Sequence, residues 1–156
     1  MDYNIVLRNF KMEDATQCSS LIQDYFRNYA DNLPVEVRNQ IADSRTTEYV
    51  QKIANDRIII VATLNAKIIG MGALKVNEIR HMYVKFKYQG KGIGSRIIKI
   101  LEREAYEKGF PSIIVNSVDH SKGFYVKNGF HLLIKTQIKR HGTILEAQLL
   151  EKFLDR

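Results

Sequence analysis

The chain has 156 residues, of which 45% are hydrophobic, and its formal net charge is +7. This length suits one core, so a single domain spanning residues 1–156 is expected, and no apolar run approaches the roughly 20 residues of a membrane span. The Lys and Arg residues are spread along the chain instead of clustering among exposed aromatic residues, which argues against nucleic acid as a partner.

The first third of the chain predicts one strand and two helices. Ile5–Arg8 alternates apolar and polar residues, as a strand does. Glu13–Tyr29 carries apolar residues at three- and four-residue steps, which predicts an amphipathic helix. The aromatic residues of this helix are expected in the core: Tyr25, Phe26 and Tyr29. A second helix is predicted over Thr46–Asn55, and the segment between the two helices gives no clear pattern.

The rest of the chain predicts mostly strands. They are Arg57–Leu64, Lys67–Val76, Glu78–Val84, Ser112–Val118, Phe130–Lys139 and Thr143–Leu150. Helices are predicted over Ser95–Tyr106, ended by Gly109, and over Ser121–Lys127, ended by Gly129. Strands and helices in this order predict a mixed α/β layer.

Gly90, Gly92 and Gly94 alternate between a predicted strand and a predicted helix. Such a turn suits phosphate, because glycine lets the backbone approach a ligand and a helix N-terminus offers unpaired N–H groups. A Walker-type loop is a poor match, since no lysine stands directly before Ser95, and a dinucleotide fingerprint has a different third spacing. By spacing alone, an ordinary turn between strand and helix explains the pattern equally well.

Two blocks of sequence resemble the GNAT superfamily of N-acetyltransferases. Ile79–Val84 followed by Tyr88–Gly94 looks like the superfamily's acetyl-CoA signature, Gln/Arg-x-x-Gly-x-Gly/Ala. Val115–Ser117 and Phe124–Phe130 are similar to its later strand and its Phe-Tyr-x-Lys-x-Gly-Phe segment. The blocks have the expected order and separation, and the likeness covers nearly the whole chain. It implies an α/β (α+β) fold with a central mixed, mostly antiparallel sheet flanked by helices on both faces.

The resemblance also implies that acetyl-CoA is the co-substrate. The residues that would hold its pyrophosphate are Gln89, Gly90, Lys91, Gly92, Ile93, Gly94 and Ser95. The residues that would flank its pantetheine arm and acetyl carbonyl are Met82, Tyr83, Val84 and, on the other side, Asn116. Phe86 stands where many members have proline and Ser121 where alanine is common, but neither change removes a group that the chemistry needs.

Acetyl transfer to an amine benefits from a base, because an alkyl ammonium with a pKa of about 10 is only about 0.1% neutral at pH 7. Glu78 is the candidate base, since its placement resembles the catalytic glutamate of the histone-acetylating branch. Three alternatives stay open: an exposed strand-edge carboxylate, an ion pair with Arg80 next door, and a water relay in place of a side-chain base.

Tyr125 is the candidate general acid, because the matched family position commonly supplies a proton to the departing CoA thiolate. The alternative is a tyrosine that packs beside Phe124 and Phe130. Either reading places the residue near the sulfur.

The other reactive side chains give weaker signals. His81 and His120 are interpreted as surface or packing residues. Cys18 is the single cysteine, which excludes an internal disulfide and predicts a buried thiol away from the cofactor strands. No group of His, Asp, Glu or Cys has metal-ligand spacing, so no metal is expected.

Together these features predict a cytoplasmic N-acetyltransferase that transfers the acetyl group of acetyl-CoA to a primary amine by direct attack. The cytoplasmic location follows from a start that lacks the pattern of a secretory signal. The alternative function is a non-catalytic acetyl-CoA-binding sensor or regulatory module. The acceptor, a small-molecule or peptide amine, is left unspecified, because residues 13–56 and the last hairpin carry no motif. A homodimer is possible, since dimers are common in the resembled family.

Overall fold

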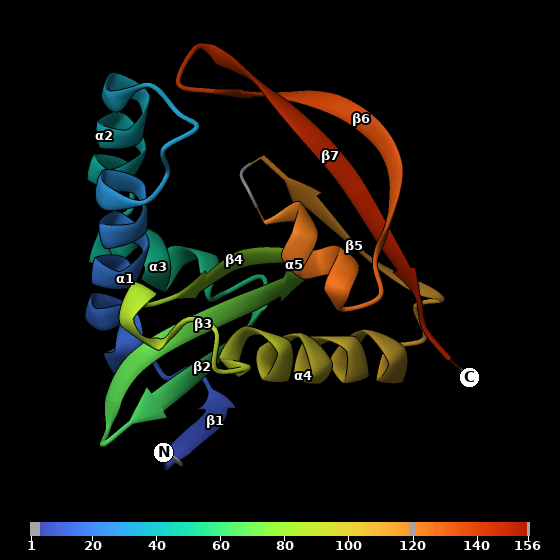
Figure 1. Cartoon of the computed structure of the whole chain (residues 1–156). Helices are drawn as coiled ribbons and strands as arrows, with labels where there is room; N and C mark the ends of the chain where they lie inside the picture. Colours follow the sequence, from blue (N-terminus) through green and yellow to red (C-terminus); the bar gives the residue numbers. More distant parts are fainter. Residues whose placement is uncertain (1–3, 119–120, 156) are drawn as a thin grey trace.

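Stretches rich in Ile and Val form the strands of the protein, and amphipathic stretches form its helices (Figure 1). The computed structural model describes residues 4–118 and 121–155. The strands are β1 Ile5–Asn9, β2 Ile58–Leu64, β3 Lys67–Lys75, β4 Glu78–Val84, β5 Ser112–Ser117, β6 His131–Arg140 and β7 Thr143–Phe153. The helices are α1 Ala15–Asn28, α2 Val35–Ser44, α3 Thr47–Ile53, α4 Ile93–Glu107 and α5 Lys122–Lys127, with short 3-10 turns η1 Met12–Asp14 and η2 Phe86–Tyr88. None of these helices has the length and apolar character needed to cross a membrane.

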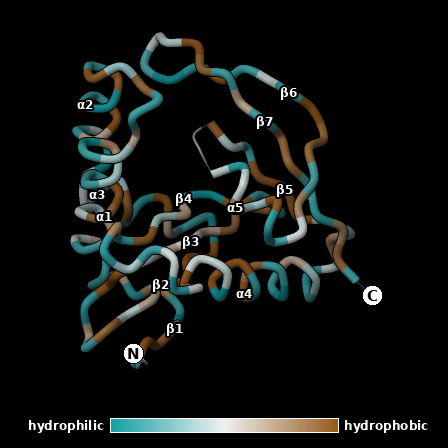
Figure 2. The backbone as a smooth tube through the Cα atoms, viewed as in Figure 1, coloured by the Kyte–Doolittle hydropathy of each residue, from teal (hydrophilic) through white to brown (hydrophobic). Residues whose placement is uncertain are grey.

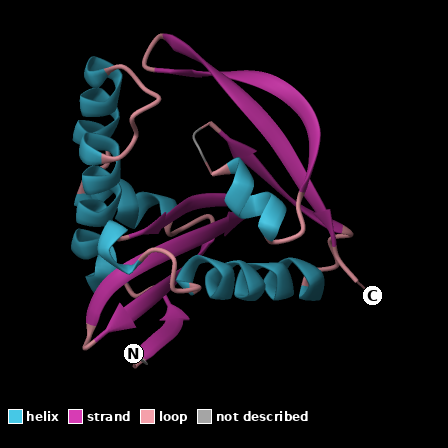
Figure 3. Cartoon of the chain, viewed as in Figure 1, coloured by secondary structure: helices cyan, strands magenta, loops and turns pink. Residues whose placement is uncertain are grey.

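Within the described part of the chain, seven strands form one sheet in the order β1-β2-β3-β4-β5-β7-β6. β4 and β5 pair in parallel, whereas the other neighbours in this order pair antiparallel. Helices lie on both sides of the strands (Figure 3), with α4 on one face and α1 and α3 on the other. The prediction of a mixed, mostly antiparallel sheet flanked by helices on both faces is therefore confirmed.

The two faces of the sheet carry separate cores, because successive strand residues point to opposite faces. In β2, Ile60 and Ala62 belong to the core that includes α4, whereas Ile59 and Val61 belong to the core that includes α1 and α3. Apolar and polar segments alternate along α4 (Figure 2), whose buried residues are Ile93, Ile97, Ile98, Leu101 and Ala105. Burying one such Ile or Leu contributes about 1.5–3 kcal/mol, so this stripe holds α4 on the sheet.

A third, smaller core joins α2 to the β6–β7 hairpin. Leu33, Val37 and Ile41 pack with Leu145 of β7 and with the half-buried Ile138 of β6. The hairpin tip and α2 therefore lie close together at one end of the molecule (Figure 1).

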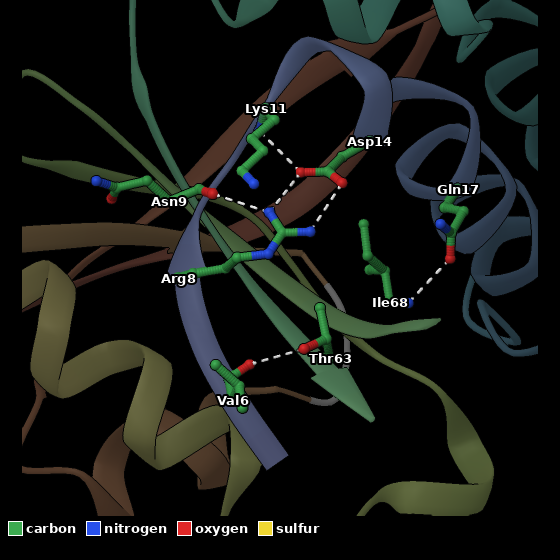
Figure 4. Close-up of polar contacts among 8 residues, drawn as sticks. All are labelled: Val6, Arg8, Asn9, Lys11, Asp14, Gln17, Thr63 and Ile68. Atoms are coloured by element: carbon green, nitrogen blue, oxygen red, sulfur yellow. Dashed lines mark hydrogen bonds and ion pairs between the residues drawn. The ribbon is translucent and has the colours of Figure 1, made fainter. Parts of the chain in front are cut away.

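A hydrogen-bonded ion pair ties β1 to the turn before α1 (Figure 4). Asp14 Oδ2 accepts from Arg8 Nη1 at 2.7 Å and from the Lys11 backbone N–H at 2.8 Å, and Oδ1 accepts from Arg8 Nη2 at 3.0 Å. The Asp14 side chain is only 5% exposed. The Arg8 guanidinium therefore lowers the pKa of this carboxyl below its usual range, although burial alone would raise it.

The fold departs from the sequence prediction in its least patterned segment, where α2 was not predicted. Pro34 precedes the first helical residue and its fixed φ suits that position, and Val37 and Ile41 lie one turn apart on the buried side. This helix is only weakly amphipathic, so the spacing of its apolar residues did not indicate a helix. Elsewhere only boundaries differ, as for α4, which begins at Ile93 inside the glycine-rich turn.

Candidate active site

A cleft of about 1140 Å³ lies where β4 and β5 separate. The turn after β4, the start of α4 and α5 line one side of it. The end of α1, residues 30–33, α3 and the tip of the β6–β7 hairpin line the other side. The cleft therefore runs from the glycine-rich turn to the helices on the opposite face of the sheet.

The cleft exists because β4 and β5 pair over only two positions, Glu78 with Ile114 and Ile79 with Val115. Beyond them the strands separate, although both continue. The backbone of residues 82–84 consequently borders the cleft on the side away from β3, and Asn116 borders it on the β5 side. Met82, Tyr83 and Val84 thus border one side of the cleft and Asn116 the other, as the sequence resemblance implied.

A β-bulge in β4 lies next to this separation. Ala73 of β3 pairs with Arg80, but Met71, two residues earlier, pairs with Tyr83, so β4 has one extra residue between these pairs. His81 within the bulge has a left-handed backbone, with φ of +54°. A bulge bends its strand and redirects the side chains around it, and this one lies directly after the two positions at which β4 pairs with β5.

The glycine-rich turn is shaped by left-handed glycines, Gly90 at φ +76° and Gly92 at φ +81°. An added Cβ would meet no atom within 4 Å at either position, so the space beside the turn is open. The first helical hydrogen bond of α4 runs from the Arg96 N–H to the Gly92 carbonyl at 3.1 Å. The N–H groups of residues 93–95 therefore have no acceptor within the helix and, with the helix dipole, form a site suited to an anion.

Other residues of this turn are held by their side chains. Gln89 Nε2 donates to the Val84 carbonyl at 3.1 Å, which fastens the turn to the end of β4. Ile93 is buried in the core beneath α4, so its N–H and not its side chain can reach a ligand. A Cβ on Gly94 would lie 2.8 Å from Phe124 Cζ, so glycine is required here for α5 to pack against α4.

Glu78 begins β4 and borders the cleft with a side chain that is 23% exposed. Its carboxylate accepts from Arg80 Nε at 3.1 Å and from Arg80 Nη2 at 3.4 Å. The ion pair considered from the sequence is therefore present. It fixes the direction of the carboxylate, which remains accessible from the cleft.

Tyr125 of α5 borders the cleft and is 4% exposed. Its ring packs edge-on against Phe124, with centroids 5.1 Å apart, and against Phe130, at 5.6 Å. The packing reading of this residue is thus correct as far as the ring is concerned. This packing is compatible with the acid role. It holds the ring in one place at the cleft, so the hydroxyl is also held in one place.

His81 is a neutral packing side chain. Its Nε2 lies 3.0 Å from Arg57 Nη1, and because a guanidinium only donates, Nε2 is the acceptor and the proton is on Nδ1. The ring meets Tyr49 edge-on, with centroids 6.0 Å apart. Burial lowers the pKa of His81 to about 3, helped by nearby guanidinium charges, so it carries no proton to donate at pH 7 as an imidazolium. His120 lies outside the described residues.

Cys18 is fully buried in the core between α1 and the sheet, as expected. Burial raises the pKa of its thiol to about 12. Since the thiolate is the nucleophilic form, this residue cannot carry an acetyl group through a covalent route at neutral pH.

The aromatic residues at the end of the α1 segment line the cleft. Tyr25 and Phe26 also pack against a core, as expected, whereas the expectation was wrong for Tyr29. The Tyr25 and Tyr83 rings lie 5.0 Å apart, and Tyr29 stacks on Phe86 at 4.9 Å with nearly parallel planes. Tyr29 is 39% exposed and Phe86 is 61% exposed. Helical periodicity identified the face correctly, but at Tyr29, just past the end of α1, that face borders the cleft instead of the core.

A second group of cleft residues was missed because it depends on contacts between distant elements. Arg45 lies in the segment that joins α2 to α3. Its guanidinium lies 4.5 Å above the ring of Tyr49, a residue of α3. Both residues line the cleft, as do Lys139 and Arg140 at the hairpin tip. No local motif marks any of them, because they come together only when α2, α3 and the hairpin pack.

The cleft brings together almost all of the residues predicted from the sequence. They are Glu78, Met82, Tyr83, Val84, Gln89, Gly90, Gly92, Ile93, Gly94, Ser95, Asn116 and Tyr125. Lys91 is exposed on the turn and does not belong to the cleft lining. The roles of these residues toward a ligand stay predictions.

Solved structures with the same fold are numerous among known proteins. A GCN5-related N-acetyltransferase from Rhodopseudomonas palustris matches with a TM-score of 0.87 and 22% identity, covering 99% of both chains. PaiA N-acetyltransferase from Thermoplasma acidophilum, solved with coenzyme A, matches with a TM-score of 0.77 and 20% identity over 96% of this chain and 99% of that one. An N-acetyltransferase from Staphylococcus aureus Mu50 matches with a TM-score of 0.74 and 21% identity over 97% and 99%.

A comparison with individual curated proteins found no match. A comparison with sequence models of whole families identifies the family. The sequence model of the Acetyltransferase (GNAT) domain, in contrast, matches residues 25–146, which include the cleft-forming strands, the glycine-rich turn and α5. Because this match spans well over half of the chain, the protein belongs to the GNAT family of acetyltransferases.

Proposed function

We propose that the protein transfers the acetyl group of acetyl-CoA to a primary amine by direct attack in the cleft between β4 and β5. The observation that carries the proposal is that one cleft joins the glycine-rich turn, Glu78 and Tyr125. Family membership supports acetyl transfer in general, and the arrangement of these groups supports an amine as the acceptor.

The residues of the cleft fit acetyl-CoA. Open space beside Gly90 and Gly92 leaves room for a pyrophosphate against the backbone, and the N–H groups at the start of α4 supply donors for it. The edge of residues 82–84 that borders the cleft supplies backbone groups that an extended pantetheine arm can bond as an added strand would. Coenzyme A in the Thermoplasma acidophilum structure, which has the same fold, supports this assignment.

Acetyl-CoA supplies the acetyl group as a thioester, and the protein handles the protons. Glu78 accepts a proton from the ammonium form of the amine, which frees the nitrogen lone pair. As the C–N bond forms and the C–S bond breaks, Tyr125 Oη gives a proton to the departing sulfur. The nitrogen loses two protons overall, of which one replaces the proton of Tyr125 and the other leaves to solvent through Glu78.

The test is release of free CoA thiol from acetyl-CoA in the presence of a panel of amines, with mass spectrometry of each amine. Amine-dependent thiol release together with a product that has gained one acetyl group is expected. Binding of acetyl-CoA without thiol release on any amine would instead favour the sensor or regulatory module. Acetylation of the protein itself in the absence of amine would contradict direct attack.

A further inference from the structure

The end of the cleft opposite the glycine-rich turn is positively charged. Among the described residues that line the cleft, the acidic ones are Asp31 and Glu78, whereas the basic ones are Arg45, Arg80, Lys127, Lys139 and Arg140. Asp31 faces Arg38 at 3.7 Å and Glu78 faces Arg80 at 3.1 Å, so each acidic group is already matched by a guanidinium. After these pairings, the described cleft lining keeps more basic than acidic side chains, so its net charge is positive.

Arg45 and Arg140 carry the part of this excess that is available to a ligand. Arg45 contacts the Ser44 hydroxyl at 3.0 Å and the ring of Tyr49, and Arg140 donates to the Lys139 carbonyl at 3.2 Å. Within residues 4–118 and 121–155, neither guanidinium has a carboxylate at ion-pair distance. Both can therefore pair with an anion that enters the cleft.

Both guanidinium groups lie near His81, which lines the same cleft. Besides burial, the charges that lower the pKa of His81 come from four arginines, Arg57, Arg45, Arg80 and Arg140, which belong to different elements. Arg57 contacts the His81 ring directly and Arg45 reaches it through Tyr49. We call the part of the cleft lined by His81, Arg45 and Arg140 the cationic pocket.

This pocket is separate from the site proposed for the phosphates of acetyl-CoA. α3, which follows Arg45 and contains Tyr49, packs on the face of the sheet that carries α1. The glycine-rich turn leads into α4, which packs on the other face. The charge at Arg45 therefore lies across the sheet from the turn proposed for the pyrophosphate, and Arg140 belongs to the hairpin whose Leu145 and Ile138 pack with α2.

We propose that the acceptor is a primary amine that also carries an anionic group, a carboxylate or a phosphate, which Arg45 and Arg140 bind while the amine points toward Glu78. The proposal rests on the proposed function and names the substrate class of that same cleft. A guanidinium matches the planar, paired oxygens of such groups with two hydrogen bonds. The same charges repel a polyamine, which would enter an already cationic pocket.

The apolar body of the acceptor has a matching wall. Tyr25, Phe26 and Tyr83 form a group of aromatic rings in the cleft lining, which also includes the stacked pair of Tyr29 and Phe86. Aromatic faces bind apolar groups and tolerate the cationic amine through cation–π contact.

The test compares matched amines with and without an anionic group. The pairs are L-phenylalanine and L-phenylalaninamide, 4-aminobutyrate and 4-aminobutyramide, and O-phosphoethanolamine and ethanolamine, with spermidine as a polycation. The anionic member of at least one pair should show a kcat/KM about tenfold or more above its neutral partner, the scale of one charge-assisted contact. The carboxylate and phosphate pairs reveal which anion the pocket prefers.

Variants assign the preference to the pocket. Arg45→Gln and Arg140→Gln should each raise the KM for the preferred anionic amine by about tenfold, with kcat and the neutral partner little changed. Arg103→Gln, an exposed position on α4 outside the cleft lining, is the matched control and should leave the preference intact. Arg140 stands at an exposed strand end, so its replacement tests the idea even if Arg45→Gln weakens the fold.

A binding measurement separates this inference from the proposed function. Calorimetric titration of the protein saturated with CoA, which cannot react, should give tighter binding of the anionic member, weakened by added salt. Such binding without thiol release from acetyl-CoA would support the charged pocket while contradicting catalysis. Equal affinity for both members of every pair, or preferential acetylation of spermidine, would overturn the inference.

Discussion

Glu78 and Tyr125 are held by different forces, and this difference decides how each can be tested. The carboxylate of Glu78 is fixed by Arg80 on a partly exposed strand, so its amide replacement disturbs one ion pair and little packing. The ring of Tyr125 is enclosed by Phe124 and Phe130, so only a change that keeps the ring separates chemistry from packing.

Replacing Glu78 with Gln should lower turnover by roughly 10- to 10,000-fold, because the amide cannot accept the ammonium proton. The loss should be largest at low pH, where less of the amine is neutral without help. Rates measured between pH 6 and pH 9 and calorimetric titration with acetyl-CoA check both parts, since cofactor binding should survive. Turnover equal to that of the wild type across this range would eliminate Glu78 as the base and favour a water relay.

Tyr125→Phe should lower turnover by roughly 10- to 1,000-fold while acetyl-CoA still binds and the melting temperature barely changes. The substitution deletes the proton donor and keeps the ring. Tyr125→Ala provides the comparison, because loss of a buried aromatic ring should cost about 3 kcal/mol of unfolding free energy. Undiminished turnover in the Phe variant would leave Tyr125 as a packing residue only.

Among individual site residues, the sequence predicted those that lie in motifs. It did not predict those whose position depends on contacts between distant parts of the chain. Gly92 and Tyr125 stand in recognisable local patterns. The contact of Arg57 with His81, in contrast, joins residues 24 positions apart across the sheet. No periodicity or spacing reports such a contact, because it depends on how the elements pack.

The glycine-rich turn is the element on which the proposed cofactor binding depends. Its two left-handed glycines shape the backbone, and the start of α4 directs N–H groups into the open space beside it. The sequence predicted this turn correctly, since its chemistry is local. It did not predict α2, because a short helix of low amphipathicity is stabilised by tertiary packing against the hairpin rather than by its own pattern.

Gly92→Val should abolish the rise in melting temperature that acetyl-CoA gives the wild type. A side chain there would occupy the space proposed for the pyrophosphate, and a β-branched residue is strained at φ +81° by about 1–3 kcal/mol. Gly109→Val is the matched control, because Gly109 has a similar φ of +88° and open surroundings but lies at the far end of α4. It should lose similar stability and keep its response to acetyl-CoA. Equal responses of the two variants would show that the turn is only structural.

Across the whole molecule, stability should depend on pH through the pair of Arg8 and Asp14. The folded pKa of Asp14 is lowered, so its contribution is fully present above the unfolded pKa of about 3.9 and is lost as pH falls through the lower folded value. Asp14→Asn should cost about 1–3 kcal/mol at pH 7 and flatten the pH dependence below about pH 5.

Chemical denaturation at several pH values measures this effect. Asp43→Asn is the control, because Asp43 pairs with Arg27 at 2.6 Å on the surface, where its side chain is 70% exposed, and such pairs contribute about 0–1 kcal/mol. A pH profile of Asp14→Asn parallel to that of the wild type would contradict the role of the buried pair.

The sheet order shows which global features could be read from the sequence. Element order and the two GNAT-like blocks predicted the mixed sheet, because strands next to one another in sequence mostly pair. The cleft was predictable only through the family resemblance. Its setting, two register pairs between β4 and β5 followed by a bulge at His81, is a matter of register that no single segment encodes.

Hydrogen–deuterium exchange with saturating acetyl-CoA tests the central claim, that the cofactor binds in the cleft with its pyrophosphate on the glycine-rich turn. We expect slower exchange for peptides covering residues 82–84 and 89–95, whose N–H groups would bond the cofactor. Exchange should be unchanged in β1, an edge strand separated from β4 by β2 and β3. Unchanged exchange over residues 89–95, with protection confined to another surface, would contradict the account.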